Sequence, residues 1–249
     1  MQSVIPAEEK EVTYTEFLPC EALRPFIYCY WELKSPPRNT PFFYRVVADG
    51  CIDLFFECDN PQMSSLMGYC NTYVEIPIMG AFHYVGVRFL PSAFPLLFGQ
   101  DAFEISAQEI PLREVVPALA TFIAQQLGAP LSLPATAQHL DDYFLRHLSQ
   151  RPLQIDNRFF SALSQILQSK GTIHISELDT GISTRQLRRL FDYYIGDNPK
   201  TFSNIVRFQH ILSAKAYHNH SFLDTYYDQA HFIKSFKTFY GDTPSKVLG

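Results

Sequence analysis

The spacing of apolar residues divides the chain into two parts with different periods. Between residues 14 and 95, aromatic and β-branched side chains gather in short runs, which are typical of strands. The runs cover residues 26–34, 42–50, 51–58 and 83–90, and turn-forming residues separate them. Apolar residues occupy both alternating positions in several runs. This predicts strands buried on both faces, as in a barrel or a sandwich.

From about residue 110 the apolar spacing becomes helical. The first helical run contains Leu112, Val115, Val116, Leu119, Phe122, Ile123 and Leu127. Pro117 predicts a bend or a restart inside this run, and Gly128 predicts its end. A second run places Ala137, Leu140, Phe144 and Leu148 on one stripe. These helices either cover the sheet or form a homodimer interface, and the sequence leaves both alternatives open.

A polar connector at residues 149–157 predicts a domain boundary. We expect a β-rich sensor or dimerisation domain over residues 1–150, with helices from about residue 110. A second, all-α domain is expected over residues 155–249. The predicted fold class is therefore α+β, with an N-terminal β-barrel-like domain and a C-terminal helical domain.

The second domain contains an internal repeat. The sequence from Ser176 aligns with the sequence from Ser221 at a constant offset of 45 residues without gaps. Both copies contain Gly-Asp-x-Pro, which begins at Gly196 in the first copy and at Gly241 in the second. Agreement over this length indicates a tandem duplication.

Each copy predicts a capped amphipathic helix with one apolar and one polar face. Ser183 and Asp228 are suitable N-cap residues, and Gln186 completes a capping box with Ser183. The polar faces carry Thr184, Arg185, Arg188 and Arg189 in the first copy, and Gln229, His231 and Lys234 in the second. Arg, Lys and Gln are the side chains that contact phosphates and base edges. A short helix, a tight turn and such a helix predict two helix-turn-helix units.

The charge distribution agrees with a DNA-facing second domain. The net charge of the chain is −5, but residues 1–154 carry 9 Lys and Arg against 17 Asp and Glu. Residues 155–249 carry 11 Lys and Arg against 8 Asp and Glu. Such an asymmetry between halves is typical of a nucleic-acid-binding segment joined to another domain.

Residues 160–247 resemble the C-terminal DNA-binding domain of the AraC/XylS transcription regulators. The resemblance is carried by IS-x-RQL-x-R-x-F, G-x-x-P, YYDQAHF-x-x-x-F and G-x-TP. It implies two recognition helices, 183–191 and 228–236, that enter successive major grooves of double-stranded DNA. A joining helix from Lys200 to Tyr217 would hold Arg207 in the place of a family arginine.

The stretches ADGCIDLFFE and GVRFLPSAFPLLFG also look like the cupin-like N-terminal domain of one subgroup of these regulators. Ala48 stands where a proline is usual before Asp-Gly. Such a domain implies ligand sensing, and aromatic and polar residues would line its pocket. The candidate ligand contacts are Tyr44, Arg45, Tyr84 and Arg88. If the protein activates transcription, RNA polymerase would be a further partner.

The chain departs from the family pattern in front of both recognition helices. A supporting helix needs about two turns, or ~7 residues. Only four residues separate Leu178 from Ser183, and only four separate Leu223 from Asp228. The alternative function is therefore a small-molecule-binding or protein-interaction module with a degenerate DNA-binding half.

Other classes of function have little support in the sequence. Five cysteines without a C-x-x-C spacing predict reduced thiols, a cytoplasmic location and no metal site. We expect no cofactor and no membrane segment. Asp53 and Glu57 share one face of a predicted strand, but no catalytic motif accompanies them. We therefore expect that the protein is not an enzyme.

Overall fold

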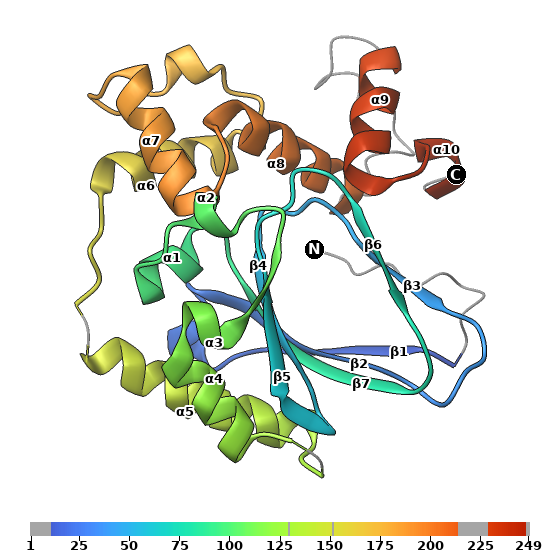
Figure 1. The fold of residues 1–249 in the computed structure, drawn as a ribbon. Helices are drawn as coiled ribbons and strands as arrows, with labels where there is room; N and C mark the ends of the chain where they lie inside the picture. The colour runs from blue at the N-terminus through green and yellow to red at the C-terminus, as the bar shows by residue number, and fades with distance from the viewer. Residues whose placement is uncertain (1–10, 129, 151, 214–228, 248–249) are drawn as a thin grey trace.

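The computed structural model of the chain describes residues 11–128, 130–150, 152–213 and 229–247. Strands between residues 13 and 111 are followed by a helical region, so the predicted α+β fold class is confirmed (Figure 1). The predicted N-cap Asp228, the segment before it and the end of the joining helix at Tyr217 lie outside the described residues.

The strands pair in two antiparallel sheets in the described part of the chain. The larger sheet has the spatial order β1 (Thr13–Phe17), β2 (Ile27–Ser35), β7 (Phe82–Phe89), β4 (Ile52–Glu57), β5 (Asn60–Met67) and β8 (Glu109–Pro111). The smaller sheet pairs β3 (Phe42–Val46) with β6 (Val74–Ile78). A short 3-10 helix, η1 (Glu21–Leu23), lies between β1 and β2.

The larger sheet is apolar on both faces because buried side chains alternate along its central strands. On β2, Tyr30 lies in one buried cluster, whereas its neighbour Trp31 lies in another on the opposite face. The cluster around Trp31 includes Phe42 and Tyr44 of the smaller sheet. The smaller sheet therefore faces one side of the larger one, as the two-faced strand pattern requires.

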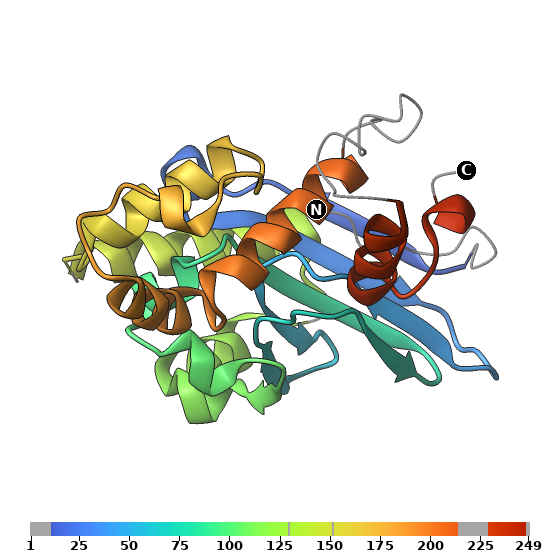
Figure 2. The same ribbon diagram turned by 90° about the horizontal axis from the view of Figure 1, so that it is seen from above.

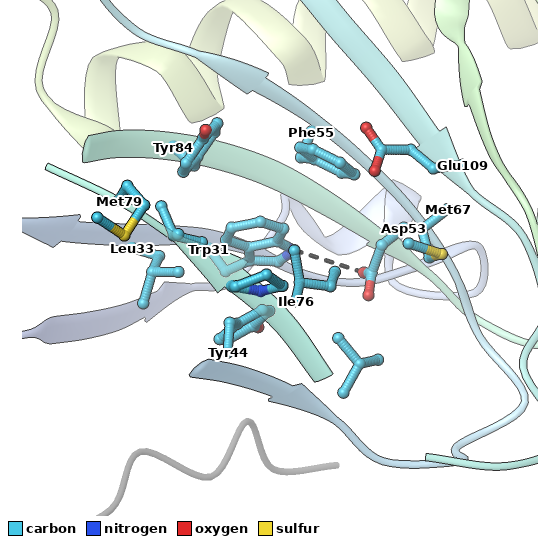
Figure 3. Close-up of a pocket in the computed structure, with 13 residues that line it drawn as sticks. Trp31, Leu33, Tyr44, Asp53, Phe55, Met67, Ile76, Met79, Tyr84 and Glu109 are labelled. Carbon is cyan, nitrogen blue, oxygen red and sulfur yellow. Dashed lines mark hydrogen bonds between the residues drawn. The ribbon is translucent and has the colours of Figure 1, made fainter. Parts of the chain in front are cut away.

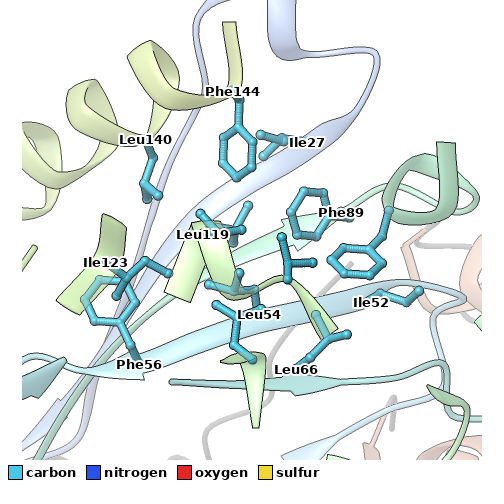
Figure 4. Close-up of a cluster of buried hydrophobic side chains, with 14 of the residues drawn as sticks. Ile27, Ile52, Leu54, Phe56, Leu66, Phe89, Leu119, Ile123, Leu140 and Phe144 are labelled. Carbon is cyan, nitrogen blue, oxygen red and sulfur yellow. The ribbon is translucent and has the colours of Figure 1, made fainter. Parts of the chain in front are cut away.

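Helices cover the other face of the larger sheet. They are α1 (Ala93–Phe98), α2 (Ala102–Ile105), α3 (Leu112–Val115), α4 (Pro117–Gln126) and α5 (Leu133–Gln150). Leu119 and Ile123 of α4 and Phe144 of α5 meet Leu54 and Phe89 of the sheet in one buried cluster (Figure 4). The two predicted helical runs thus cover the sheet, and Pro117 restarts the helix after α3, as expected.

The C-terminal helices lie along one edge of this unit (Figures 1 and 2). They are α6 (Asn157–Gln168), the 3-10 turn η2 (Ile175–Glu177), α7 (Thr184–Ile195), α8 (Pro199–Ser213), α9 (Gln229–Tyr240) and α10 (Pro244–Val247). Their buried side chains share a cluster with Val47, Ala48 and Tyr69 from loops of the strand region. The two parts of the chain are therefore packed together through a common apolar core.

Candidate functional site

The two faces of α7 differ in chemistry as its sequence predicts. Leu187 and Phe191 are buried, whereas Thr184, Arg185, Arg188 and Arg189 are all exposed. None of these three arginines forms an ion pair with another described residue. The guanidinium groups on this face are thus available to an external anion.

The N-terminus of α7 is fixed by the predicted capping box. The Ser183 hydroxyl accepts a hydrogen bond from the Gln186 backbone at 3.3 Å, and the Ser183 backbone donates to the Gln186 side chain at 3.2 Å. These bonds satisfy backbone groups that the first turn of a helix leaves unpaired. Gln186 is therefore a capping residue, which agrees with its omission from the predicted DNA contacts.

The helices α7 and α9 end in the same way at positions 45 residues apart. The next residues, Gly196 and Gly241, have φ of 97° and 94°, which only glycine adopts readily. The Gly196 N–H donates to the Asp192 carbonyl at 3.0 Å, and the Gly241 N–H donates to the Lys237 carbonyl at 3.0 Å. The repeat in the sequence is thus a repeat of helix and terminating turn.

The aspartates of the two Gly-Asp-x-Pro motifs also have one role. Asp197 accepts a hydrogen bond from the Asn198 backbone at 2.7 Å, and Asp242 accepts one from the Thr243 backbone at 2.8 Å. Each motif then supplies the proline that begins the next helix, α8 or α10. Each turn therefore ends one helix and begins the next helix at its proline.

The segment before α7 is short, as its sequence indicates. One 3-10 turn, η2, stands where a helix-turn-helix unit has a supporting α-helix. The side chain of Gln165 on α6 braces the chain after this turn. It donates to the Asp179 carbonyl at 3.1 Å and accepts from the Asp179 N–H at 3.1 Å. This amide pair holds the turn together with Ile175 and Leu178, which pack against the helical core.

We expect Gln165→Ala to lower the free energy of unfolding by about 1–2 kcal/mol, since both Asp179 backbone groups lose their partner. Urea denaturation monitored by circular dichroism measures this. Gln168→Ala is the matched control, because Gln168 lies on the same helix and, within the described chain, its side chain bonds Ser164 one turn away at 3.1 Å. An equal change in both variants would show that Gln165 has no bracing role.

The joining helix α8 carries Arg207 at the position that the resemblance singled out. Its guanidinium donates to the Gly171 carbonyl at 2.6 Å, at the turn that follows α6. In the described chain Arg207 thus binds α8 to the turn at the end of α6. In Figures 1 and 2, α8 lies between α7 and α9.

The predicted contacts on α9 are exposed. Gln229, His231 and Lys234 face away from the core, whereas Phe232 and Phe236 are buried with their ring centroids 5.8 Å apart. The apolar stripe therefore seats α9 as predicted, and the predicted contacts lie on its exposed face.

The C-terminal end of α9 is bound to two loops of the strand region. The Ala48 N–H donates to the Phe239 carbonyl at 3.1 Å, and the Tyr73 N–H donates to the Thr238 carbonyl at 3.2 Å. The Ala48 carbonyl accepts a hydrogen bond from Gln209 of α8 at 2.7 Å. A proline at position 48 has no N–H and could not bond Phe239. Ala48, at the position where the resemblance leads one to expect a proline, thus binds the end of α9 to the strand region.

A cavity of about 270 Å³ lies between the two sheets (Figure 3). Its walls come from both sheets and from the β6–β7 turn. The lining residues are Trp31, Leu33, Tyr44, Val46, Asp53, Phe55, Met67, Ile76, Pro77, Ile78, Met79, Tyr84 and Glu109. Such an aromatic and aliphatic lining with few polar groups is typical of small-molecule sites.

Two of the four predicted ligand contacts, Tyr44 and Tyr84, line this cavity. Arg45 is on β3 but points elsewhere: it pairs with Glu75, and its guanidinium lies 5.7 Å from the ring centre of Tyr240 on α9. Tyr44 thus faces the cavity, whereas its neighbour Arg45 faces α9.

Arg88, the fourth predicted contact, is buried behind the cavity wall. Its guanidinium donates to Asp53 at 3.0 Å, and a second carboxylate, Asp49, lies 3.7 Å away. Burial raises the pKa of the Asp49 carboxyl, against the opposing effect of Arg88. Asp53 thus belongs to a buried, hydrogen-bonded ion pair with Arg88.

The predicted ligand contacts did not include Trp31, Asp53, Phe55 or Glu109. Trp31 packs against Gly86 of the neighbouring strand, where a Cβ atom would lie 2.2 Å from the indole ring. The signal available in the sequence was the parity of the strand residues, because Asp53 and Phe55 alternate with the core residues Leu54 and Phe56.

No group of three His, Cys, Asp or Glu side chains in the described part of the chain is arranged to hold a metal ion. Likewise, no described helix combines the length and the apolar character needed to cross a membrane.

Comparison with known proteins adds one match within the strand region. A family model described as "Domain of unknown function (DUF6597)" matches residues 15–111. The match spans nearly all of the strands, from β1 to β8. A search of curated proteins found no match. Among solved structures, the crystal structure of ToxT from Vibrio cholerae O395 is similar over 96% of this chain and 98% of that chain, with a TM-score of 0.42 and 10% sequence identity.

Proposed function

We propose that this protein is a sequence-specific DNA-binding transcription regulator of the AraC/XylS type. Residues 155–249 form its DNA-binding domain, and residues 1–150 form a domain that receives a small-molecule signal in the cavity between the sheets. The proposal places the protein in the cytoplasm, where it meets its DNA.

The observation that carries this proposal is the repeated unit formed by α7, α9 and their terminating turns. Both helices bury an aromatic stripe and expose polar and cationic side chains. Arginine donates two hydrogen bonds to guanine, glutamine can do the same to adenine, and lysine neutralises phosphate. Two such faces joined by α8 suit a DNA duplex better than a single charged helix would.

Each exposed residue has an expected role at the DNA. Arg185, Arg188 and Arg189 would contact bases and phosphates from α7, and Thr184 a phosphate near the start of that helix. Gln229, His231 and Lys234 would act in the same way from α9. Loss of a phosphate contact would weaken binding to all sequences, whereas loss of a base contact would relax specificity.

A gel-shift titration on the DNA upstream of the protein's own gene tests the proposal. We expect tighter binding to this DNA than to a scrambled duplex of equal length, and an affinity that falls as salt concentration rises. Equal affinity for both duplexes would contradict the proposed function.

The short turn η2 favours a second candidate, a small-molecule-binding protein whose DNA-binding half has degenerated. In that case α7 lacks the support that a helix needs to press into a groove. A folded protein that shows no salt-dependent DNA binding, but binds a small molecule in the cavity, would support this candidate.

A further inference from the structure

The cavity between the sheets has two chemically different ends. Figure 3 shows Asp53 and Glu109 together near Met67, whereas Leu33 and Met79 lie at the opposite end, with Trp31 between them. The described lining includes two carboxylates and no lysine, arginine or histidine side chain. A molecule that fills this space would therefore meet negative charge at one end and apolar groups at the other.

The two carboxylates differ in how their charge is balanced. Asp53 is 9% exposed and accepts hydrogen bonds from the Arg88 guanidinium, so its charge is largely compensated. Glu109, on β8, is exposed and forms no ion pair with another described residue. The uncompensated negative charge at this end of the cavity therefore comes from Glu109.

Aromatic rings line the space between the two ends. Trp31 lies 6.4 Å from Tyr44 and 6.4 Å from Phe55, measured between ring centroids. Phe55 in turn meets Tyr84 edge-on at 6.1 Å. The faces of such rings attract cations within about 6 Å, and tryptophan does so most strongly. Gly86 leaves the room that the Trp31 ring occupies, since a Cβ atom at this position would lie 2.2 Å from the indole.

We infer that the cavity takes a small apolar amine. Its ammonium group would lie between Glu109 and the aromatic rings, and its hydrocarbon part would lie towards Leu33 and Met79. An anion of the same shape would meet Glu109 without a free cation to receive it. The volume of about 270 Å³ lies just below the range of about 300–1,000 Å³ for drug-sized ligands, so a small ligand fits. This inference rests on the proposed role of the cavity as a signal-receiving site.

The fluorescence of Trp31 provides a direct readout, because it is the single tryptophan of the sequence and lines the cavity. The full chain is titrated with phenylbutylamine, phenylbutanol and phenylbutyrate, which share one skeleton and differ in charge. The shift in unfolding temperature provides a second measure of binding. We expect the amine to bind at least roughly tenfold more tightly than phenylbutyrate, with the alcohol between them.

Glu109→Gln should remove most of the difference between the amine and the alcohol and leave the affinity for the alcohol almost unchanged. Glu104→Gln, which changes the same charge at an exposed site on α2, should alter none of the three affinities. Gly86→Ala should weaken binding of both the amine and the alcohol, because its new methyl group displaces the indole ring.

Equal or tighter binding of phenylbutyrate would overturn the inference, as would failure of the amine to bind a protein with normal unfolding. DNA binding is measured on the same preparation. A protein that binds DNA but not the amine leaves the proposed DNA-binding function intact, whereas one that binds the amine but not DNA leaves the inference intact.

Discussion

Arg188→Ala and Arg189→Ala should each weaken binding to upstream DNA by about 1–3 kcal/mol if the side chain contacts a base, and the double variant should lose more. The physical reason is that both side chains are exposed on α7 and form no ion pair with a described residue. Fluorescence anisotropy with a labelled duplex measures the dissociation constants.

Arg113→Ala is the matched control, since Arg113 is exposed on α3 and its loss changes the net charge equally. It should leave the affinity close to that of the unaltered protein. Unchanged affinity in both α7 variants would remove this helix from the DNA-reading surface. An equal loss in the control would indicate a general charge effect.

Gly171→Ala should lower the free energy of unfolding by about 3 kcal/mol or more. Gly171 has φ of 73°, and its missing Cβ would lie 2.1 Å from the Ser203 carbonyl oxygen of α8. The left-handed conformation costs about 1–2 kcal/mol for a residue with a side chain, and overpacking adds about 1–3 kcal/mol. The variant would also disturb the bond between Arg207 and the Gly171 carbonyl.

Gly181→Ala isolates the backbone part of this effect. Gly181 has a similar φ of 66°, but apart from its chain neighbours no atom of the described residues lies within 4 Å of its would-be Cβ. We expect it to lose only about 1–2 kcal/mol. Urea denaturation of both variants gives the comparison, and a Gly171→Ala variant too unstable to purify agrees with it. Equal losses would mean that the contact between the α6 turn and α8 does not matter.

The helices of the C-terminal part could be predicted well because their signals are local. Gly196 and Gly241 end α7 and α9 where the repeat indicates, and Ser183 caps α7 as expected. Pro117 restarts α4 after the end of α3. Each of these outcomes depends on a residue's own backbone preference, which its neighbours in space do not change.

The strands were predicted less completely. The turn-forming residues within 58–62 predict a turn. In the structure, however, Asn60 and Pro61 begin β5, and the side chains at this end of the strand are mostly polar or exposed. The strand exists because β4 pairs with it in an antiparallel register. Pairing of this kind depends on a distant segment, so a short polar strand carries a weak signal of its own.

Part of the cavity lining and the docking of α9 could not be predicted from the sequence, for a related reason. Met67 joins the cavity because β5 pairs with β4, and Glu109 joins it because β8 pairs with β5 at the edge of the larger sheet. Ala48 reads as a simple departure from a family pattern, whereas in the fold its N–H holds the end of α9. Both features arise from tertiary contacts between residues far apart along the chain.

A footprint of the protein on the DNA that it binds tests the central claim most directly. If α7 and α9 both read DNA, the unaltered protein should protect two segments about one helical turn, or ~10 base pairs, apart. The Arg188→Ala and Arg189→Ala double variant should lose protection in one segment, and Lys234→Ala should lose it in the other. Protection that both variants leave intact, or no protected segment at all, would contradict the tandem reading of DNA.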